Sequence, residues 1–291
     1  MSDKASPSSS NAEIRERPVA PGDHVSDDHP TLDYDIAGPA DGPLLVLGPS
    51  LGTSRRIWDA HRDFLNGRFR VLRYDLPGHG SSPTASLGHP AHGATTVARL
   101  ADSVLELVDQ QGRDTFAYAG ISLGGAIGIQ LALAYPGQVT ALGLICTSAH
   151  FGGRTAWRER ADLVRRSGMA PLVRSSPSRW FAEPATADSP FGRTLLDGLT
   201  RVEPDGYAAC CEALATFDVR TDLHTLGAPT WVLGGTRDVA TPVEHAQELA
   251  DAIPRADLRI ADCGHLAVEA PEAVEALLCE LRAAVRPLVG Q

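Results

Sequence analysis

Short, mostly apolar runs alternate with segments of helical periodicity along most of the chain. The runs cover residues 44–47, 69–74, 115–119, 141–146, 230–233 and 256–260. Between them apolar residues recur every three or four positions, as at Val97, Leu100, Val104 and Val108, which is the spacing of a helix with one buried face. Continuous apolar runs are typical of strands covered on both faces. Strands alternating with helices predict an α/β fold with a mostly parallel, doubly wound sheet.

The start of the chain has a different pattern. Residues 1–29 are polar, rich in serine and proline, and show no apolar period, which predicts a flexible N-terminal tail. Apolar and polar positions begin to alternate at residues 31–34, as expected for an edge strand. We therefore expect the α/β core to be formed by residues 30–149 and 224–291.

Residues 150–223 break the alternation. They contain no convincing buried strand, and helical stretches over 154–166, 191–201 and 206–216 are punctuated by prolines at positions 171, 177, 184 and 190. An insertion of helices after the strand that ends near Cys146 predicts a helical cap. We expect the cap to cover the carboxyl edge of the sheet, because open α/β sheets bind their ligands at that edge.

The strongest chemical signal is the segment Gly120-Ile121-Ser122-Leu123-Gly124. It fits Gly-x-Ser-x-Gly, in which a tight turn from a strand into a helix exposes the serine hydroxyl. The motif is short and could occur by chance, but its context supports it. A predicted buried strand precedes Ser122, and a helix rich in glycine and alanine follows it. We therefore expect Ser122 to be a nucleophile.

A serine hydroxyl needs a base and an orienting acid, and in this arrangement they follow in the order acid, then histidine. Asp238 and His265 each come directly after a predicted strand, and we expect them to fill these roles. Asp262 and Asp218 are alternative acids. His79, in the turn at residues 75–82, is an alternative base, but we expect a structural role for it because His265 is better placed in chain order.

An oxyanion hole needs two backbone N–H groups directed at the developing negative charge. Leu123 follows the nucleophile directly and should supply one of them. Leu51, in the loop after the strand at residues 44–47, is expected to supply the other.

Together these motifs resemble the α/β-hydrolase superfamily over residues 31–287, and several segments are similar to 3-oxoadipate enol-lactonases. Ser50 to Thr53, with Trp58-Asp59 a few residues on, is similar to the oxyanion loop of that family. Further similar segments are residues 69–75, Trp157, Gly168-Met169, 179–181, 205–211 and 240–242. The chain departs from the family at Ile121, where leucine is more usual, and in the loosely fitting stretch 175–189.

The resemblance implies hydrolysis of 3-oxoadipate enol-lactone to 3-oxoadipate during the degradation of aromatic compounds, without a metal or an organic cofactor. Such a substrate carries a free carboxylate, which a cation or several donors in the cap should bind. The candidate substrate-binding residues are Trp157, Arg160, Arg179, Trp180 and Tyr207. A carboxylesterase or methyl esterase, or a cofactor-free perhydrolase, would use the same three catalytic residues. A ligand-binding receptor built on the same fold is a different alternative.

Composition limits the expected binding partners and the expected compartment. The formal net charge of −10 argues against a nucleic-acid partner, which usually faces a basic surface. No apolar run reaches the roughly 20 residues that a membrane-spanning helix needs. The five cysteines are odd in number and lack the spacing of a disulfide framework, which fits a reducing compartment. We expect a cytoplasmic protein with a small-molecule substrate; the oligomeric state stays open.

Overall fold

A computed structural model describes residues 31–88 and 92–285 of the chain. The predicted tail at residues 1–29 therefore lies outside the described residues. The described part is built on a seven-stranded sheet with the strand order β1-β3-β2-β4-β5-β6-β7. The strands are β1 (Tyr34–Ala37), β2 (Leu44–Gly48), β3 (Arg70–Tyr74), β4 (Phe116–Ile121), β5 (Val139–Ile145), β6 (Thr230–Gly235) and β7 (Ala256–Ala261).

The pairing of the strands confirms the predicted fold class. Only β1 runs antiparallel to its neighbour β3, and each of the other pairs is parallel. Every residue of β2 and β4 is buried, as the continuous apolar runs indicated. The alternating pattern at residues 31–34 predicted an edge strand, and the strand β1 begins at the last of these residues, Tyr34. The N–H of the residue before it, Asp33, donates to the Ser82 hydroxyl rather than to a strand.

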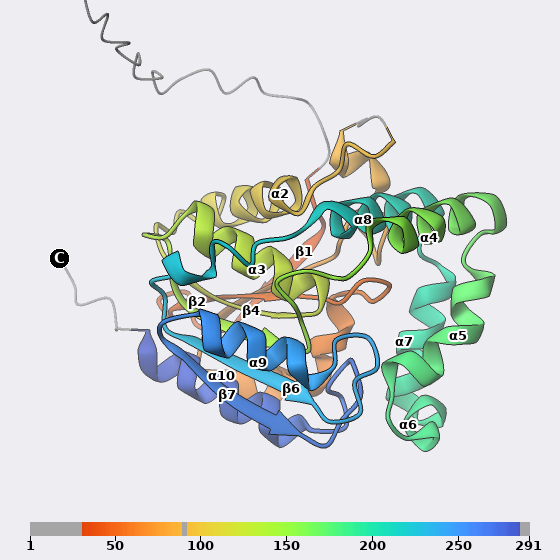
Figure 1. The fold of residues 1–291 in the computed structure, drawn as a ribbon. Helices are drawn as coiled ribbons and strands as arrows, with labels where there is room; N and C mark the ends of the chain where they lie inside the picture. The colour runs from red at the N-terminus through yellow and green to blue at the C-terminus, as the bar shows by residue number, and fades with distance from the viewer. Residues whose placement is uncertain (1–30, 89–91, 286–291) are drawn as a thin grey trace, which may run out of the picture.

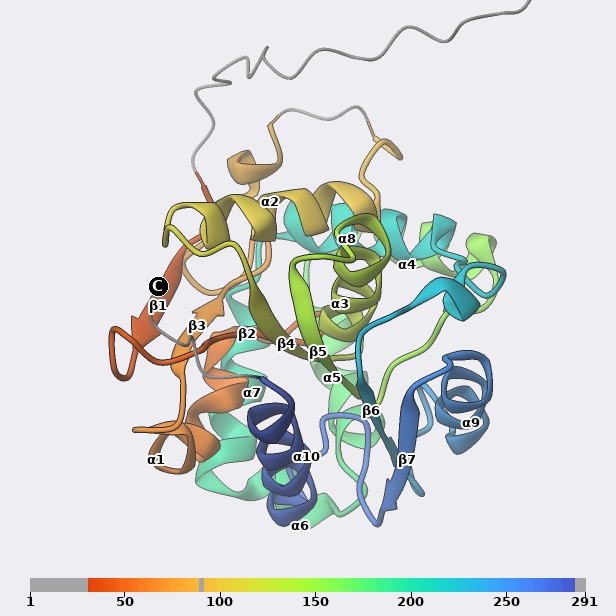
Figure 2. The same cartoon turned by 90° about the vertical axis from the view of Figure 1, so that its left-hand side faces the viewer.

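Helices cover both faces of the sheet (Figure 2). One face carries α2 (Val97–Asp109), α3 (Leu123–Ala134) and α9 (Val243–Ala252). The other face carries the 3-10 segment η1 (Arg55–His61), α1 (Arg62–Leu65) and α10 (Pro271–Ala284). Two short 3-10 turns, η2 (Thr84–Leu87) and η3 (Leu223–Thr225), complete the core. The helix α3 packs between α2 and the central strands. It is therefore buried, and apolar, on nearly all sides.

The insertion between β5 and β6 forms a cap at the carboxyl ends of the strands (Figure 1). It consists of α4 (Arg154–Ser167), α5 (Ala170–Trp180), α6 (Pro184–Asp188), α7 (Pro190–Thr200) and α8 (Pro204–Thr216). The predicted helical stretches did not include α5. Pro177 lies inside α5, which ends three residues later at Trp180, so the missing N–H affects only the last turn.

Within residues 31–88 and 92–285, no helix is both long enough and apolar enough to cross a bilayer.

Candidate active site

Ser122 occupies a strained turn between β4 and α3. Its φ angle is +56°, a left-handed conformation that few residues other than glycine adopt. Two glycines allow the turn to be this tight: a Cβ atom at Gly120 would lie 2.3 Å from the backbone of Gly124, and one at Gly124 would lie 2.5 Å from the Gly48 carbonyl oxygen. Strain of this kind is found at functional sites, where the surrounding structure maintains it. The geometry is that of the predicted nucleophile turn.

Asp238 and His265 are held together in loops that follow β6 and β7. His265 Nδ1 lies 3.0 and 2.9 Å from the two carboxylate oxygens of Asp238. An ionised carboxylate only accepts hydrogen bonds, so Nδ1 carries the proton and donates it to Asp238. In the neutral ring Nε2 is then the basic nitrogen.

The Asp238 carboxylate has further donors around it. It accepts from the N–H groups of Ala240 and Thr241 at 2.8 and 3.0 Å, and from the Thr241 hydroxyl at 2.6 Å. Burial disfavours its charge, but the attraction of His265 and the hydrogen bonds from His265 and Thr241 outweigh it and lower the pKa of Asp238. The carboxylate is therefore ionised at neutral pH. Thr241 is a member of the site that sequence reasoning noted only through the resemblance.

The alternative acids and the alternative base lie elsewhere. Asp262 accepts from Thr236 and Arg237, and Asp218 from Arg220. His79 is fully buried, and its two ring nitrogens are bonded to backbone atoms of Pro77 and Gly52. None of these three residues lines the cavity that contains Ser122.

Ser122 and His265 line one small cavity beneath the cap. Its volume is about 50 Å³, so the cavity suits a small substrate. Core and cap both contribute to its wall, which consists of Ser50, Leu51, Ser122, Phe151, Trp157, Arg160, Arg179, Trp180, Leu214, Ala240, Thr241 and His265. Four of the five predicted substrate-binding residues are among them.

Two arginines of the cap bring positive charge into the cavity. Arg160 donates from Nε to the Tyr207 hydroxyl at 3.0 Å, and its guanidinium carbon lies 5.6 Å from the ring centre of Trp157. Burial, and then the positive charge of Arg160, lower the pKa of Arg179. Among the described residues neither arginine forms an ion pair with a carboxylate. The cavity is therefore cationic in a chain that is acidic overall, and it favours an anionic ligand.

Tyr207 is the predicted substrate-binding residue that the structure keeps away from the cavity wall. Its side chain is buried behind Arg160. The two tryptophans do line the cavity, and Trp157 is fixed there by a hydrogen bond from Nε1 to the Phe151 carbonyl oxygen at 2.7 Å.

The two predicted oxyanion donors lie at the expected places. Leu51 lines the cavity in the loop after β2, and Leu123 is the first residue of α3, directly after Ser122. Within the part of the chain that the structure describes, neither backbone N–H donates a hydrogen bond. Leu51 lines the cavity wall and Leu123 does not, and the N-terminus of α3 adds the positive end of its dipole at Ser122.

Glu269 joins the His265 loop to the cap, and sequence reasoning did not find it. Its carboxylate accepts from the N–H groups of Gly264, Glu183 and Ala182 at 2.8, 2.9 and 3.0 Å. Burial opposes its ionisation, but these backbone donors prevail and lower the pKa of Glu269. The Leu266 N–H also donates to the carbonyl oxygen of Trp180 at 3.2 Å. Only its position four residues after His265 could have drawn attention to Glu269.

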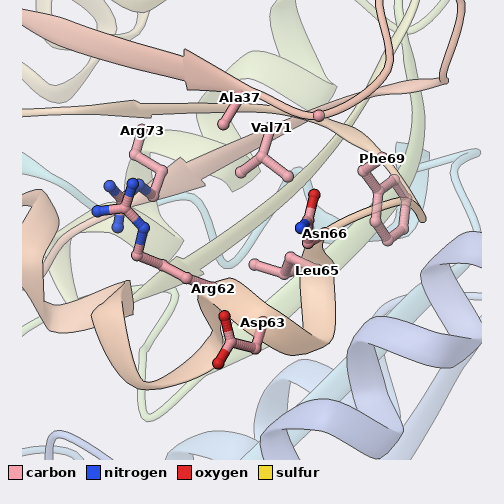
Figure 3. Close-up of a pocket in the computed structure, with 9 residues that line it drawn as sticks. Ala37, Arg62, Asp63, Leu65, Asn66, Phe69, Val71 and Arg73 are labelled. Carbon is pink, nitrogen blue, oxygen red and sulfur yellow. The ribbon is translucent and has the colours of Figure 1, made fainter.

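A second hollow lies between α1 and the strands β1 and β3 (Figure 3). It is larger, at about 260 Å³ on the same measure, but it contains no serine, cysteine or histidine. Its buried cation is already neutralised, since Arg73 forms ion pairs with Asp35 at 2.6 Å and Asp59 at 2.7 Å. Volume alone therefore does not mark the site, and the cavity at Ser122 is the one with reactive groups.

The chain is similar in sequence and in fold to known hydrolases. A 3-oxoadipate enol-lactonase (number 2) of Acinetobacter baylyi is 34% identical over 244 residues, which is 83% of this chain and 89% of that protein. The crystal structure of the enol-lactonase from Burkholderia xenovorans LB400 superposes with a TM-score of 0.81 at 30% identity, covering 87% of this chain and 96% of that one. A protein of Agrobacterium fabrum with the provisional name carbamate hydrolase RutD is 28% identical, covering 80% of this chain and 89% of its own.

The family comparison covers most of the residues over which the sequence resembles α/β-hydrolases. The model described as the alpha/beta hydrolase family matches residues 45–277, a span that includes the Ser122 turn, the whole cap and the His265 loop. The chain belongs to the alpha/beta hydrolase family.

Proposed function

We propose that the protein is a serine hydrolase that opens a small lactone, namely 3-oxoadipate enol-lactone. The observation that carries the proposal is the joint placement of Ser122, His265 and the two arginines Arg160 and Arg179 in one small cavity. The first two residues supply the chemistry of acyl transfer, and the arginines supply the charge that a substrate with a free carboxylate requires. The similarity to enol-lactonases supports this choice of substrate.

The first half of the reaction forms an acyl-enzyme. Ser122 Oγ attacks the lactone carbonyl while His265 Nε2 takes the hydroxyl proton. Asp238 holds the ring in the correct tautomer and stabilises the imidazolium that forms. The N–H groups of Leu51 and Leu123 bind the oxygen that becomes negative.

Collapse of this intermediate breaks the bond between the carbonyl carbon and the ring oxygen. His265 returns its proton to the departing enol oxygen, and the enol then becomes the more stable ketone. Because the leaving group is part of the same molecule, the whole substrate stays attached to Ser122 as an ester.

Water completes the cycle. His265 removes a proton from a water molecule, which attacks the ester carbon, and the Ser122 oxygen leaves with the proton that His265 now carries. The product is a dicarboxylate, 3-oxoadipate. Its second negative charge forms beside His265 and Ser122, while the first remains at the arginines.

Arg160 and Arg179 are the groups that we assign to the free carboxylate of the substrate. Hydrogen bonds between a guanidinium group and a carboxylate are stronger than neutral ones. Binding an anion would also relieve the repulsion that Arg160 exerts on Arg179. A neutral ester of the same size would lack this contribution.

The test is the rate at which the purified protein removes the ultraviolet absorbance of enzymatically generated enol-lactone. We expect rapid loss with the native chain and none above background with Ser122→Ala. Phenyl acetate and an N-aryl carbamate serve as neutral comparison substrates. Cleavage of either one in preference to the lactone would overturn the choice of substrate but keep the serine hydrolase. A single slow turnover with retained product would instead indicate a ligand-binding receptor.

A further inference from the structure

The turn between β3 and η2 contains a buried histidine that the proposed mechanism does not use. His79 has no exposed surface. Its Nδ1 lies 2.8 Å from the Pro77 carbonyl oxygen, which can only accept, so Nδ1 carries a proton. Its Nε2 lies 3.1 Å from the backbone N of Gly52 and accepts the N–H of that residue. The tautomer of His79 is therefore fixed by two backbone partners.

The bond to Gly52 acts on the loop that contains Leu51. The peptide group on one side of Leu51 is held through its oxygen, since the Thr53 N–H and hydroxyl donate to the Ser50 carbonyl at 3.0 and 2.8 Å. The peptide group on the other side is held by its N–H, which donates to His79. These two restraints together fix the direction of the Leu51 N–H.

Gly52 has no side chain that could fix its conformation. Its φ angle is +87°, a region that glycine reaches at little steric cost. Without an acceptor at the position of His79 Nε2, the Gly52 N–H would be a buried donor without a partner. The loop would then gain by turning that N–H elsewhere, which would shift Thr53 and with it the Ser50 carbonyl, the group that shares a peptide plane with the Leu51 N–H.

The cap holds the histidine ring from its other side. The ring of Tyr207, at the start of α8, stacks on His79 with 6.0 Å between centres and an angle of 25° between planes. The backbone of α8 also contacts the turn directly, because the Glu203 N–H donates to the Gly78 carbonyl oxygen at 2.8 Å. This places Tyr207 between His79 and Arg160, which donates to its hydroxyl.

A neutral His79 ring is needed to accept the Gly52 N–H. Burial lowers the pKa of His79 to about 4, so the ring is neutral and Nε2 is a free acceptor at the pH at which the enzyme would work.

From this geometry we propose that His79 is a positioning residue, clamped by Tyr207 of the cap, that holds the Leu51 N–H in the direction the oxyanion hole requires. The proposal rests on the proposed function, since it assumes acyl transfer at Ser122. In this role His79 uses both its bond to Gly52 and its contact with Tyr207 of the cap. It assigns no proton transfer to His79.

The test compares His79→Gln with His79→Asn. A glutamine can place its side-chain oxygen close to the position of Nε2 and accept from Gly52, whereas asparagine is too short to do so. Ser82→Ala is the matched control, because Ser82 lies in the same turn and is buried, and its hydroxyl makes two hydrogen bonds, with the backbone of Asp75 and of Asp33, outside the oxyanion loop. Thermal unfolding of each variant shows whether it is folded.

Two inhibitors separate the oxyanion hole from the rest of the cavity. A boronic acid that bonds to Ser122 places an oxygen in the hole, whereas butyrate, a monocarboxylate without the second carboxylate that forms at Ser122, reports on the arginines. We expect His79→Asn to lower kcat roughly 10- to 100-fold, because a displaced oxyanion donor loses most of its effect. His79→Asn should weaken binding of the boronic acid by a similar factor and leave the affinity for butyrate within about threefold. His79→Gln should recover most of kcat, and Ser82→Ala should lower Tm without this split.

Three results would overturn the proposal: equal kcat in the two His79 variants, equal weakening of both inhibitors, or the same loss of kcat in Ser82→Ala. The same measurements with phenyl acetate keep the test independent of the substrate, since every ester needs the oxyanion hole. If the native chain hydrolyses phenyl acetate but not the lactone, only the proposed substrate fails, and the comparison of His79 variants still decides this inference.

Discussion

The carboxylate of Asp238 lies within 3.0 Å of His265 Nδ1 through both of its oxygens. The same carboxylate is held by the backbone and the hydroxyl of Thr241, so it cannot turn away from the ring without losing those bonds. The tautomer of His265 therefore depends on a carboxylate that is itself fixed in place.

Replacing this carboxylate by an amide should remove catalysis while keeping the shape of the site. In Asp238→Asn the amide can offer an N–H to Nδ1 and favour the tautomer with its proton on Nε2, which cannot accept the proton of Ser122. We expect kcat to fall roughly 10⁴-fold with little change in KM. Steady-state kinetics measures both. Asp262→Asn in the neighbouring exposed loop is the control, and a loss below tenfold in Asp238→Asn would contradict the assignment of the acid.

Arg179→Ala should weaken binding of the lactone without harming the chemistry. The loss of one charge-assisted contact to the substrate carboxylate corresponds to an increase in KM of roughly 10- to 100-fold. Hydrolysis of neutral phenyl acetate should be unchanged. Arg174→Ala is the matched control, because Arg174 lies on the same helix but is exposed. An unchanged KM for the lactone in Arg179→Ala would remove Arg179 from the carboxylate site.

Glu269 should make stability depend on pH, because its three backbone donors favour the ionised form. The pKa of Glu269 is lowered on folding. Its contribution to stability is therefore fully present above the unfolded value of about 4.3 and is lost as the pH falls through the lower folded value. Urea unfolding between pH 6 and pH 3 should show a smaller loss of stability in Glu269→Gln than in the native chain. Parallel curves for the two proteins would contradict this role.

The turn at Ser122 should not tolerate a side chain at Gly120. A Cβ atom there would lie 2.3 Å from the backbone of Gly124, so α3 would have to move away from β4. We expect Gly120→Ala to cost roughly 3 kcal/mol and to lower Tm by about 5 °C or more, with loss of activity. Gly137 has nothing within 4 Å of the corresponding position, and Gly137→Ala in thermal unfolding is the control. Equal Tm values for the two variants would show that the turn is less tightly packed than the distances indicate.

The fold and the reactive residues could be predicted from the sequence because each has a local signal. Apolar runs reveal strands covered on both faces, and Ser122 is flanked by the glycines that its turn requires. Asp238 and His265 follow strands whose carboxyl ends meet at one edge. Some residues act on segments that are distant in the sequence and come close only in the folded chain, and these could not be predicted in this way. Glu269 acts on N–H groups of the cap, and Tyr207 faces the turn at His79 instead of the cavity.

The central claim is that Ser122 forms a covalent ester with the substrate, and the mass of the protein tests it most directly. The enzyme is mixed with the enol-lactone, quenched in acid within milliseconds and analysed by intact-protein mass spectrometry, with peptide mapping to locate the adduct. Opening a ring expels no fragment, so we predict a gain equal to the full mass of the lactone on the peptide that contains Ser122, and no gain in Ser122→Ala. Rapid turnover by Ser122→Ala, or an adduct on another residue, would contradict the account.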